Sequence, residues 1–136
     1  MKGFFRRPLV VAKVVVRNDK GDVLLIRRSI TAPPKVALTW DLPGGIVDPG
    51  ESPAETAVRE TREETGLNIS DVQLLSVEIE PGPVHIIVVF YGTKISSDDV
   101  KLSHEHDQHQ WLQSEKIDDI KINPLYKQAA QISHPG

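Results

Sequence analysis

The most constraining feature of this chain is residues 52–66, SPAETAVRETREETG, which carry the start and stop signals of one helix. Ser52 is suited to cap the N-terminus and Pro53 to occupy the first helical position, and Glu55 completes a capping box with Ser52. Gly66 is suited to the left-handed residue that ends many helices. The sequence therefore predicts a helix with well-defined ends, which any fold of the chain must accommodate.

The acidic residues of this helix lie where an isolated helix disfavours them. Glu60, Glu63 and Glu64 fall near its C-terminal end, where the helix dipole is negative. Like charges three and four residues apart also repel each other, by roughly 0.2–0.5 kcal/mol per pair. The helical period brings the three carboxylates to one face or its edge. A divalent cation would turn this repulsion into coordination, and hard carboxylate oxygens favour Mg²⁺ or Mn²⁺ over zinc.

A solvated helix face is the alternative interpretation of these acids. Arg59 and Arg62 lie among them and are placed to neutralise them at the surface. Taken alone, an acidic run of this kind favours the solvated face. The residues that flank the helix are what favour a functional site instead.

Eight residues in and around the helix belong to one motif, in chain order Gly45, Glu51, Arg59, Glu60, Glu63, Glu64, Gly66 and Leu67, and a ninth, Gly44, belongs to the stretch WDLPGG that leads into it. This set resembles the Nudix box of the Nudix hydrolases, the MutT-like group, with the box spanning residues 45–67. Thr61 departs from the pattern, which prefers an aliphatic residue there, and this difference concerns packing more than chemistry.

The resemblance implies one α/β domain over residues 1–136, a Nudix-type α/β/α sandwich with a mixed sheet and a loop–helix–loop catalytic motif. The remaining pattern agrees with that architecture. Strands are expected at 9–17, 23–28, 72–80 and 84–94, a short strand at 111–112, and a last helix at 124–132. Residues 29–38 and the polar stretch 96–109 are expected to be loops.

The resemblance also implies metal-dependent hydrolysis of a nucleoside diphosphate linked to another group, X. It implies that Glu60 and Glu64 are ligands of Mg²⁺, with Mn²⁺ as a substitute. Glu63 is implied as a ligand or as support for metal-bound water, and the carbonyl of Gly45 as a further ligand. Arg59 is expected to brace the preceding loop through an ion pair with Glu51.

The general base is left open between two residues. The resemblance allows either Glu64, the last glutamate of the box, or Glu105, six residues before Trp111. An ordinary loop acid is the alternative for Glu105. His104, His106 and His109 lie in the same polar stretch, and without cysteines they are expected to be solvated or substrate-facing rather than zinc ligands.

Four residues are candidates for substrate contacts, each with an alternative role. Arg28 and its neighbour Arg27 end a predicted strand; Arg28 is preferred, and a plain surface charge is its alternative. Trp40 is placed to stack on a base or to pack in the core. Asn123 lies where MutT-like proteins read a base, although its position before Pro124 favours a helix N-cap.

Net charge and cysteine content indicate the kind of partner and the compartment to expect. The net charge of −3 offers no bulk field for nucleic acid or an anionic membrane, so a small nucleotide is the expected partner. The chain has no cysteine, which favours a cytoplasmic protein. The start, MKGFFRRPLVVAKVVV, is expected to contain a strand rather than a signal peptide, because Lys13 interrupts the apolar run. Homodimers are common in the family, and the sequence leaves the oligomeric state open.

The substrate is the least determined part of the prediction. A short chain with no added domain resembles the nucleoside-triphosphate pyrophosphatases of the family, which release a monophosphate and pyrophosphate. An oxidised dGTP is one candidate, on account of Glu105 and Asn123. An ADP-ribose or nucleotide-sugar pyrophosphatase is the alternative, with Pro81 and Pro83 as a loose match. A nucleotide sensor without turnover is the alternative of another class.

Overall fold

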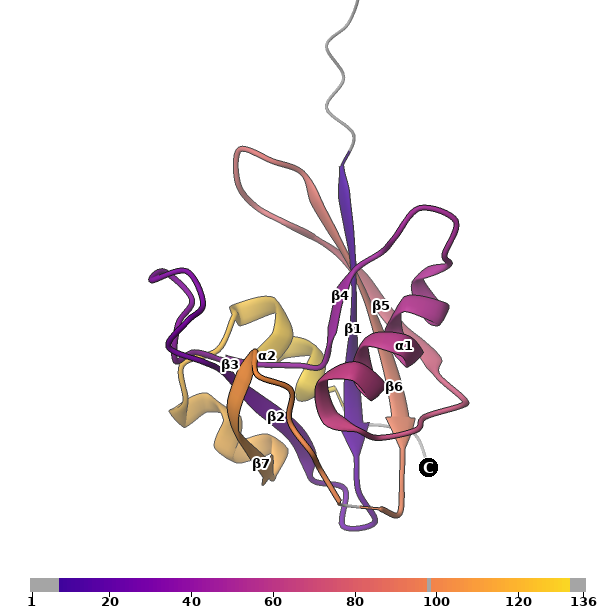
Figure 1. Cartoon of the computed structure of the whole chain (residues 1–136), viewed down its shortest axis with the longest axis vertical. Coiled ribbons are helices and arrows are strands. Elements are labelled where there is room, and N and C mark those ends of the chain that lie inside the picture. Colours follow the sequence, from indigo (N-terminus) through magenta and orange to yellow (C-terminus); the bar gives the residue numbers. More distant parts are fainter. Residues whose placement is uncertain (1–7, 98, 133–136) are drawn as a thin grey trace, which may run out of the picture.

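The computed structural model describes residues 8–97 and 99–132. In chain order, its elements are β1 (Leu9–Arg17), β2 (Val23–Arg28), β3 (Trp40–Asp41), β4 (Gly44–Ile46), α1 (Pro53–Thr65), β5 (Gln73–Glu80), β6 (Ile86–Lys94), β7 (His106–Leu112), the 3-10 helix η1 (Ser114–Asp119) and α2 (Pro124–Ala130) (Figure 1). The strands expected at 9–17 and 23–28 are confirmed. In the described residues, no helix is both long enough and apolar enough to span a membrane.

The described strands form one seven-stranded mixed sheet. Its main order is β3-β2-β1-β6-β5, with β4 paired to β1 and β7 paired to β2. β1 runs parallel to β6 along its whole length, and the other pairs are antiparallel. β1 and β2 meet at Arg17 and Val23, whereas the N-terminal half of β1 pairs with β4. The segment 40–45 therefore crosses from the edge of β2 to β1, and we call it the crossing segment.

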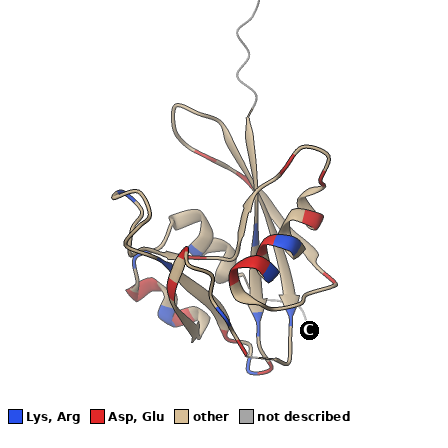
Figure 2. Ribbon diagram, viewed as in Figure 1, with Lys and Arg blue, Asp and Glu red and all other residues tan. Residues whose placement is uncertain are grey.

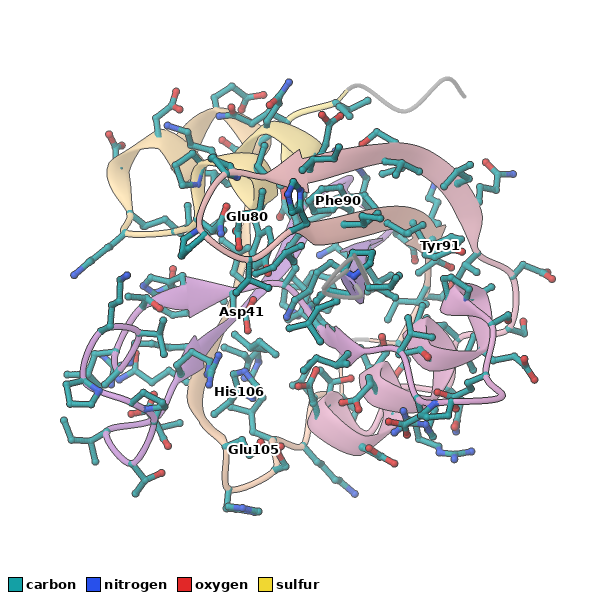
Figure 3. All side chains as sticks on the ribbon, turned by 90° about the horizontal axis from the view of Figure 1, so that it is seen from above. Asp41, Glu80, Phe90, Tyr91, Glu105 and His106 are labelled. Carbon is teal, nitrogen blue, oxygen red and sulfur yellow. The ribbon has the colours of Figure 1, made fainter. Side chains whose placement is uncertain are left out.

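Two apolar clusters lie on opposite faces of the sheet. Successive residues of β1 point to opposite faces, so Val14 belongs to one cluster and Val15 to the other. The cluster of Val14 includes Ala57 of α1, and that of Val15 includes Ala129 of α2. Figure 3 shows the two helices on opposite sides of the sheet. The three layers of an α/β/α sandwich are thus the arrangement expected from the sequence.

Helix α1 has the ends that its sequence predicts. The hydroxyl of Ser52 accepts a hydrogen bond from the Glu55 amide at 3.1 Å, and the Glu55 carboxylate accepts one from the Ser52 amide at 2.9 Å. Gly66 ends the helix with a φ of 74°, in the left-handed region. The buried face of α1 includes Ala57, Thr61 and Glu64. The last box glutamate therefore points toward the sheet, where its environment differs from that of a surface acid.

We expect Ser52→Ala to lower the stability of the protein by about 1 kcal/mol, because the amide of Glu55 loses its capping acceptor. The melting temperature should fall by about 3–5 °C. Thermal unfolding followed by circular dichroism measures this change. Ser70→Ala is the matched control, since Ser70 is an exposed residue in the loop after α1. An equal change in the two variants would contradict a capping role.

The structure corrects part of the expected organisation. Residues 96–109 were expected to be a loop, but β7 begins at His106 and pairs with β2. Its residues 107–110 are all exposed, so the strand shows no alternation of apolar and polar residues. The short strands β3 and β4 are not among the elements that the sequence predicts. The last helix ends at Ala130, two residues earlier than expected.

Candidate active site

The last three glutamates of helix α1, Glu60, Glu63 and Glu64, lie at different depths beside the crossing segment. The side chain of Glu63 is 52% exposed and that of Glu60 is 20% exposed. Glu64 is buried, and its carboxylate accepts a hydrogen bond of 2.8 Å from the amide of Gly44. The helical spacing therefore spreads the acids from the surface to the sheet, and the deepest one is anchored to the backbone of the crossing segment.

Gly45 permits a close approach between β4 and the Glu60 side chain. A Cβ atom at position 45 would lie 2.9 Å from Cδ of Glu60, which is shorter than real Cβ contacts. Only a residue without a side chain lets the carboxyl group of Glu60 lie this close to the strand. Gly45 and Glu60 are thus neighbours, as a shared site requires.

Arg59 is the counter-ion of the exposed part of this acidic group. Its guanidinium donates to Glu51 at 2.7 and 3.0 Å, to Glu60 at 3.1 Å, to Glu63 at 3.1 and 3.2 Å, and to Asp48 at 3.1 Å. The Glu51–Arg59 ion pair expected from the sequence is present, and these hydrogen bonds hold the pKa of Glu51 well below its usual range. Figure 2 shows basic and acidic residues close together on α1.

Burial raises the pKa of two of the acids, Glu60 and Glu64. It raises the pKa of Glu64 to about 8, although nearby Lys13 and the Gly44 amide act in the opposite direction. Burial also raises the pKa of Glu60, with the charges of Glu63 and Glu105 adding to the effect while Arg59 opposes it. These carboxylates are therefore costly to ionise in the protein alone.

The donor set fits a hard divalent cation. Carboxylate oxygens beside a glycine-rich backbone are the ligand type that Mg²⁺ prefers. In residues 8–97 and 99–132, no three acidic or histidine side chains already converge as an ion site. Arg59 holds Glu60 and Glu63, so binding would exchange Arg59 for the cation at these two acids, whereas the Gly44 amide holds only Oε1 of Glu64.

Glu105 lies in the turn before β7 and is exposed. Its carbonyl accepts a hydrogen bond from the Ser29 amide at 3.0 Å, and the Ser103 amide donates to the carbonyl of Glu64 at 3.2 Å. This turn is thereby tied both to the end of β2 and to the end of α1. The charge of Glu105 is close enough to contribute to the raised pKa of Glu60. The structure therefore brings a residue far along the chain to the acids of the box.

His106 differs from the other two histidines of this region. His104 and His109 are exposed, as expected, but His106 is only 5% exposed, so the expectation of a solvated or substrate-facing side chain is wrong for it. Its Nε2 lies 3.6 Å from Oδ2 of Asp41. Figure 3 shows Asp41, His106 and Glu105 in succession between β2 and α1.

A buried ion pair beside the acids was not anticipated from the sequence. Nζ of Lys13 lies 3.1 Å from Oδ1 of Asp41 and 5.3 Å from the centre of the Tyr126 ring. Burial alone would lower the pKa of Lys13, but the Asp41 carboxylate raises it above its ordinary value. Burial would raise the pKa of Asp41, and Lys13 instead lowers it. The available signal was Lys13 itself, a charged residue in the middle of a valine-rich strand.

The two arginines at the end of β2 have different surroundings. Arg27 makes two hydrogen bonds to the carboxylate of Asp107, at 2.9 and 3.0 Å, and so has a partner on β7. Among the described residues, the Arg28 side chain has neither an ion pair nor a hydrogen bond to a side chain or backbone group. The positive charge of Arg28 lies close enough to Tyr126 of α2 to oppose the increase that burial causes in the pKa of this phenol. Tyr126 also lies beside Lys13. Of the two, Arg28 is therefore the one free to meet an anionic substrate.

The other two candidates for substrate contacts have structural partners. Trp40 packs against the apolar cluster on the α2 side of the sheet, which agrees with its alternative role in the core. Asn123 caps α2, with Oδ1 accepting from the Leu125 amide at 2.9 Å, and its Nδ2 donates to Glu80. Substrate contact by either residue stays a prediction, and Asn123 would have to give up a partner to make it.

Comparison with known proteins identifies the family. A family model described as the NUDIX domain matches residues 7–134. The chain belongs to the Nudix family. This Nudix chain is 53% identical, over 57 residues, to a Bacillus subtilis (strain 168) protein named provisionally as an 8-oxo-dGTP diphosphatase; the match covers 42% of the chain and 34% of that protein.

Two longer matches cover most of the chain. The asymmetrical bis(5'-nucleosyl)-tetraphosphatase of Caenorhabditis elegans is 35% identical over 119 residues, which is 80% of each protein. The crystal structure of a MutT protein from Methanosarcina mazei Go1 superposes with a TM-score of 0.80 at 32% identity, covering 93% of this chain and 94% of that one. The predicted Nudix fold is thereby confirmed. The chain spans 34% to 54% of the lengths of the first curated relatives that it matches.

Proposed function

We propose that this Nudix protein hydrolyses a phosphoanhydride bond of a nucleoside diphosphate linked to X, with a nucleoside triphosphate as the preferred substrate class. The products would be a nucleoside monophosphate and pyrophosphate. The observation that carries the proposal is the group of Glu60, Glu63 and Glu64 around Gly44 and Gly45. A pure binding module would have no need of this set of mutually repelling carboxylates.

We assign Glu60, Glu63 and Glu64 as the residues that would hold Mg²⁺, with the Gly45 carbonyl as a further ligand. The cation would neutralise phosphate charge and lower the barrier to attack by water. Arg59 would keep the acids in place and offset part of their negative charge until the cation replaces it. Arg28 would face the phosphates or the sugar.

Glu105 is our preferred general base. A base needs access to the attacking water, and Glu105 is exposed whereas Glu64 is 7% exposed and bonded to Gly44. The turn that carries Glu105 is fixed to α1 and to β2, so its carboxylate has a defined approach to the acids. Glu64 is then the anchor of the metal site rather than the group that takes the proton.

We expect Glu105→Gln to lower kcat by about 10²-fold or more, because the amide cannot accept the proton of the attacking water. The magnesium concentration that gives half-maximal rate should stay unchanged, since Glu105 is assigned no metal contact. Pyrophosphate release across a magnesium titration measures both quantities. His104→Gln, one residue earlier and also exposed, is the control. A large shift in the magnesium requirement would instead make Glu105 a metal ligand.

An oxidised purine nucleoside triphosphate is the first substrate to test. The Bacillus subtilis relative carries the name of such an activity, although its match covers only 42% of this chain. A dinucleoside tetraphosphate is the second, because the Caenorhabditis elegans relative aligns over 80% of both proteins. ADP-ribose and nucleotide sugars are the remaining alternatives.

A product screen separates these possibilities. The protein is incubated with 8-oxo-dGTP, dGTP, a diadenosine tetraphosphate, ADP-ribose and a nucleotide sugar, each with Mg²⁺ and with EDTA. Chromatography of the products then identifies the bond that is cut. Tight nucleotide binding without any magnesium-dependent product would favour the sensor alternative over the enzyme.

The compartment and the kind of partner are proposed from composition and net charge. The absence of cysteine from all 136 residues supports a reducing compartment such as the cytoplasm. The net charge of −3 supports a small nucleotide rather than a nucleic acid polymer as the partner. Homodimer formation stays a prediction, which sedimentation velocity at micromolar protein concentration tests directly.

A further inference from the structure

The Asp41 carboxylate joins groups from three parts of the chain. Oδ1 and Oδ2 lie 3.1 and 3.3 Å from Nζ of Lys13, and Oδ1 also accepts a hydrogen bond from the Leu42 amide at 2.8 Å. Nζ of Lys13 donates a further bond of 3.1 Å to the Leu42 carbonyl. Both side chains are less than one tenth exposed. The ion pair therefore clamps the backbone at Leu42, within the crossing segment, onto the middle of β1.

The clamped segment leads directly to the two box glycines. Gly44 pairs with Lys13 in the register between β4 and β1, and its amide holds Glu64. A Cβ atom at Gly44 would lie 2.0 Å from the Ala12 carbonyl oxygen, so the backbone of the segment lies directly against β1 at this point. The position of the Gly44 amide, and through it that of the Glu64 carboxylate, depends on where Leu42 is held.

The other side of Asp41 meets the turn that carries Glu105. His106 follows Glu105, is 5% exposed, and has neither ring nitrogen hydrogen-bonded to another described residue. Its polar neighbour is Asp41, at 3.6 Å. The same carboxylate thus contacts the crossing segment on one side and the beginning of β7 on the other.

We propose that Asp41 is a positioning residue of this Nudix site, which sets the box glycines and the Glu105 turn relative to the acids of α1. This inference rests on the proposed hydrolase function for its kinetic consequence. The alternative is a buried ion pair that serves stability alone. Buried pairs are often replaceable by apolar residues without loss of stability, so the two roles can be separated experimentally.

The first test is Asp41→Asn, which keeps the size of the side chain but removes its charge. We expect kcat to fall by about 10- to 100-fold, as for other residues that orient reactive groups, with little change in KM. The matched control is Asp118→Asn, which alters another aspartate–lysine pair, 3.6 Å from Lys127, at the surface. Wild-type kcat in Asp41→Asn would overturn the proposal.

The decisive variant is the double substitution Lys13→Met and Asp41→Leu, which removes both charges together. We expect the variant to fold with a melting temperature close to that of the wild type, because the bonds lost at Leu42 offset the gain from removing two buried charges, and a kcat that stays about 10- to 100-fold lower. Recovery of wild-type kcat in this variant would show that the pair serves stability alone, and would overturn the proposal. The double variant also decides the question if Asp41→Asn does not fold.

Hydrogen exchange at the Gly44 amide gives a readout that needs no turnover. In the double variant we expect faster exchange at Gly44, while amides in the middle of β6 stay protected as in the wild type. Exchange as slow as in the wild type would overturn the positioning role, whatever the kinetics show. Wild-type protein that releases no product from any nucleotide would instead overturn the proposed function, and the exchange result would still stand on its own.

Discussion

Replacing Glu64 with glutamine should reduce magnesium-dependent hydrolysis by about 10²-fold or more while leaving the fold intact. Glutamine is nearly the same size and keeps an oxygen to accept the hydrogen bond from the Gly44 amide. It cannot supply a negative charge, either as a metal ligand or as a base. Initial rates across a magnesium titration, measured beside a thermal melt, test this expectation.

The same substitution should stabilise the metal-free protein. Burial raises the pKa of Glu64 from 4.5 to about 8, so the folded state holds this proton more tightly than the unfolded state. The resulting stabilisation is complete below pH 4.5 and is lost as the pH rises to about 8. Glutamine never ionises and escapes this loss, which is on the order of a few kcal/mol.

The pH dependence provides the control for this argument. In EDTA at pH 8, Glu64→Gln should melt about 5 °C or more above the wild type, and the difference should disappear near pH 4.5. Glu55→Gln is the comparison, because Glu55 is an exposed acid at the other end of the same helix. Near-wild-type turnover in Glu64→Gln would reject its place in the site. A melting temperature below the wild type at pH 8 would reject the electrostatic account.

The second large effect is expected at Gly44. This residue has a φ of 141°, and a Cβ atom there would lie 2.0 Å from the Ala12 carbonyl oxygen and 2.8 Å from Cα of Lys13. Both neighbours are backbone atoms of the central strand, which cannot move aside as a flexible side chain can. Gly44→Ala should therefore destabilise the protein by about 4 kcal/mol or more, enough to leave much of it unfolded. Urea unfolding followed by tryptophan fluorescence measures the loss.

Gly21 separates the two causes of this effect. It also has a positive φ, 81°, but an added Cβ atom would meet nothing within 4 Å. Gly21→Ala should therefore cost only about 1 kcal/mol, from the backbone conformation alone. If the two variants lost equal stability, the clash with β1 would not be the reason why Gly44 is required.

The sequence predicts the helix of the box well because every signal that defines it is local. The capping pair at Ser52 and Glu55 and the left-handed Gly66 lie within the segment that they shape. The charge pairing of Arg59 with Glu51 and Glu63 is also set by short spacing along the chain. For this part of the site, periodicity and resemblance together are sufficient.

The rest of the site depends on contacts between distant segments. Lys13 and Asp41 are 28 residues apart, and no periodicity relates them. His106 was assigned to a polar loop because the strand that it begins has four exposed polar residues in a row. Its burial follows from the pairing of β7 with β2 and from the position of Asp41, neither of which is visible in the local sequence.

The parallel pairing of β1 with β6 has a consequence for how the molecule assembles. These neighbours at the centre of the sheet are separated in sequence by the crossing segment, α1 and β5. Joining them closes a long loop, and such closures slow folding because chain entropy is lost before many contacts form. A nascent chain that ends before residue 86 lacks β6, the strand that pairs with β1 along its whole length. The acids of α1 and the sheet that supports them therefore reach their final arrangement only after β6 has been synthesised.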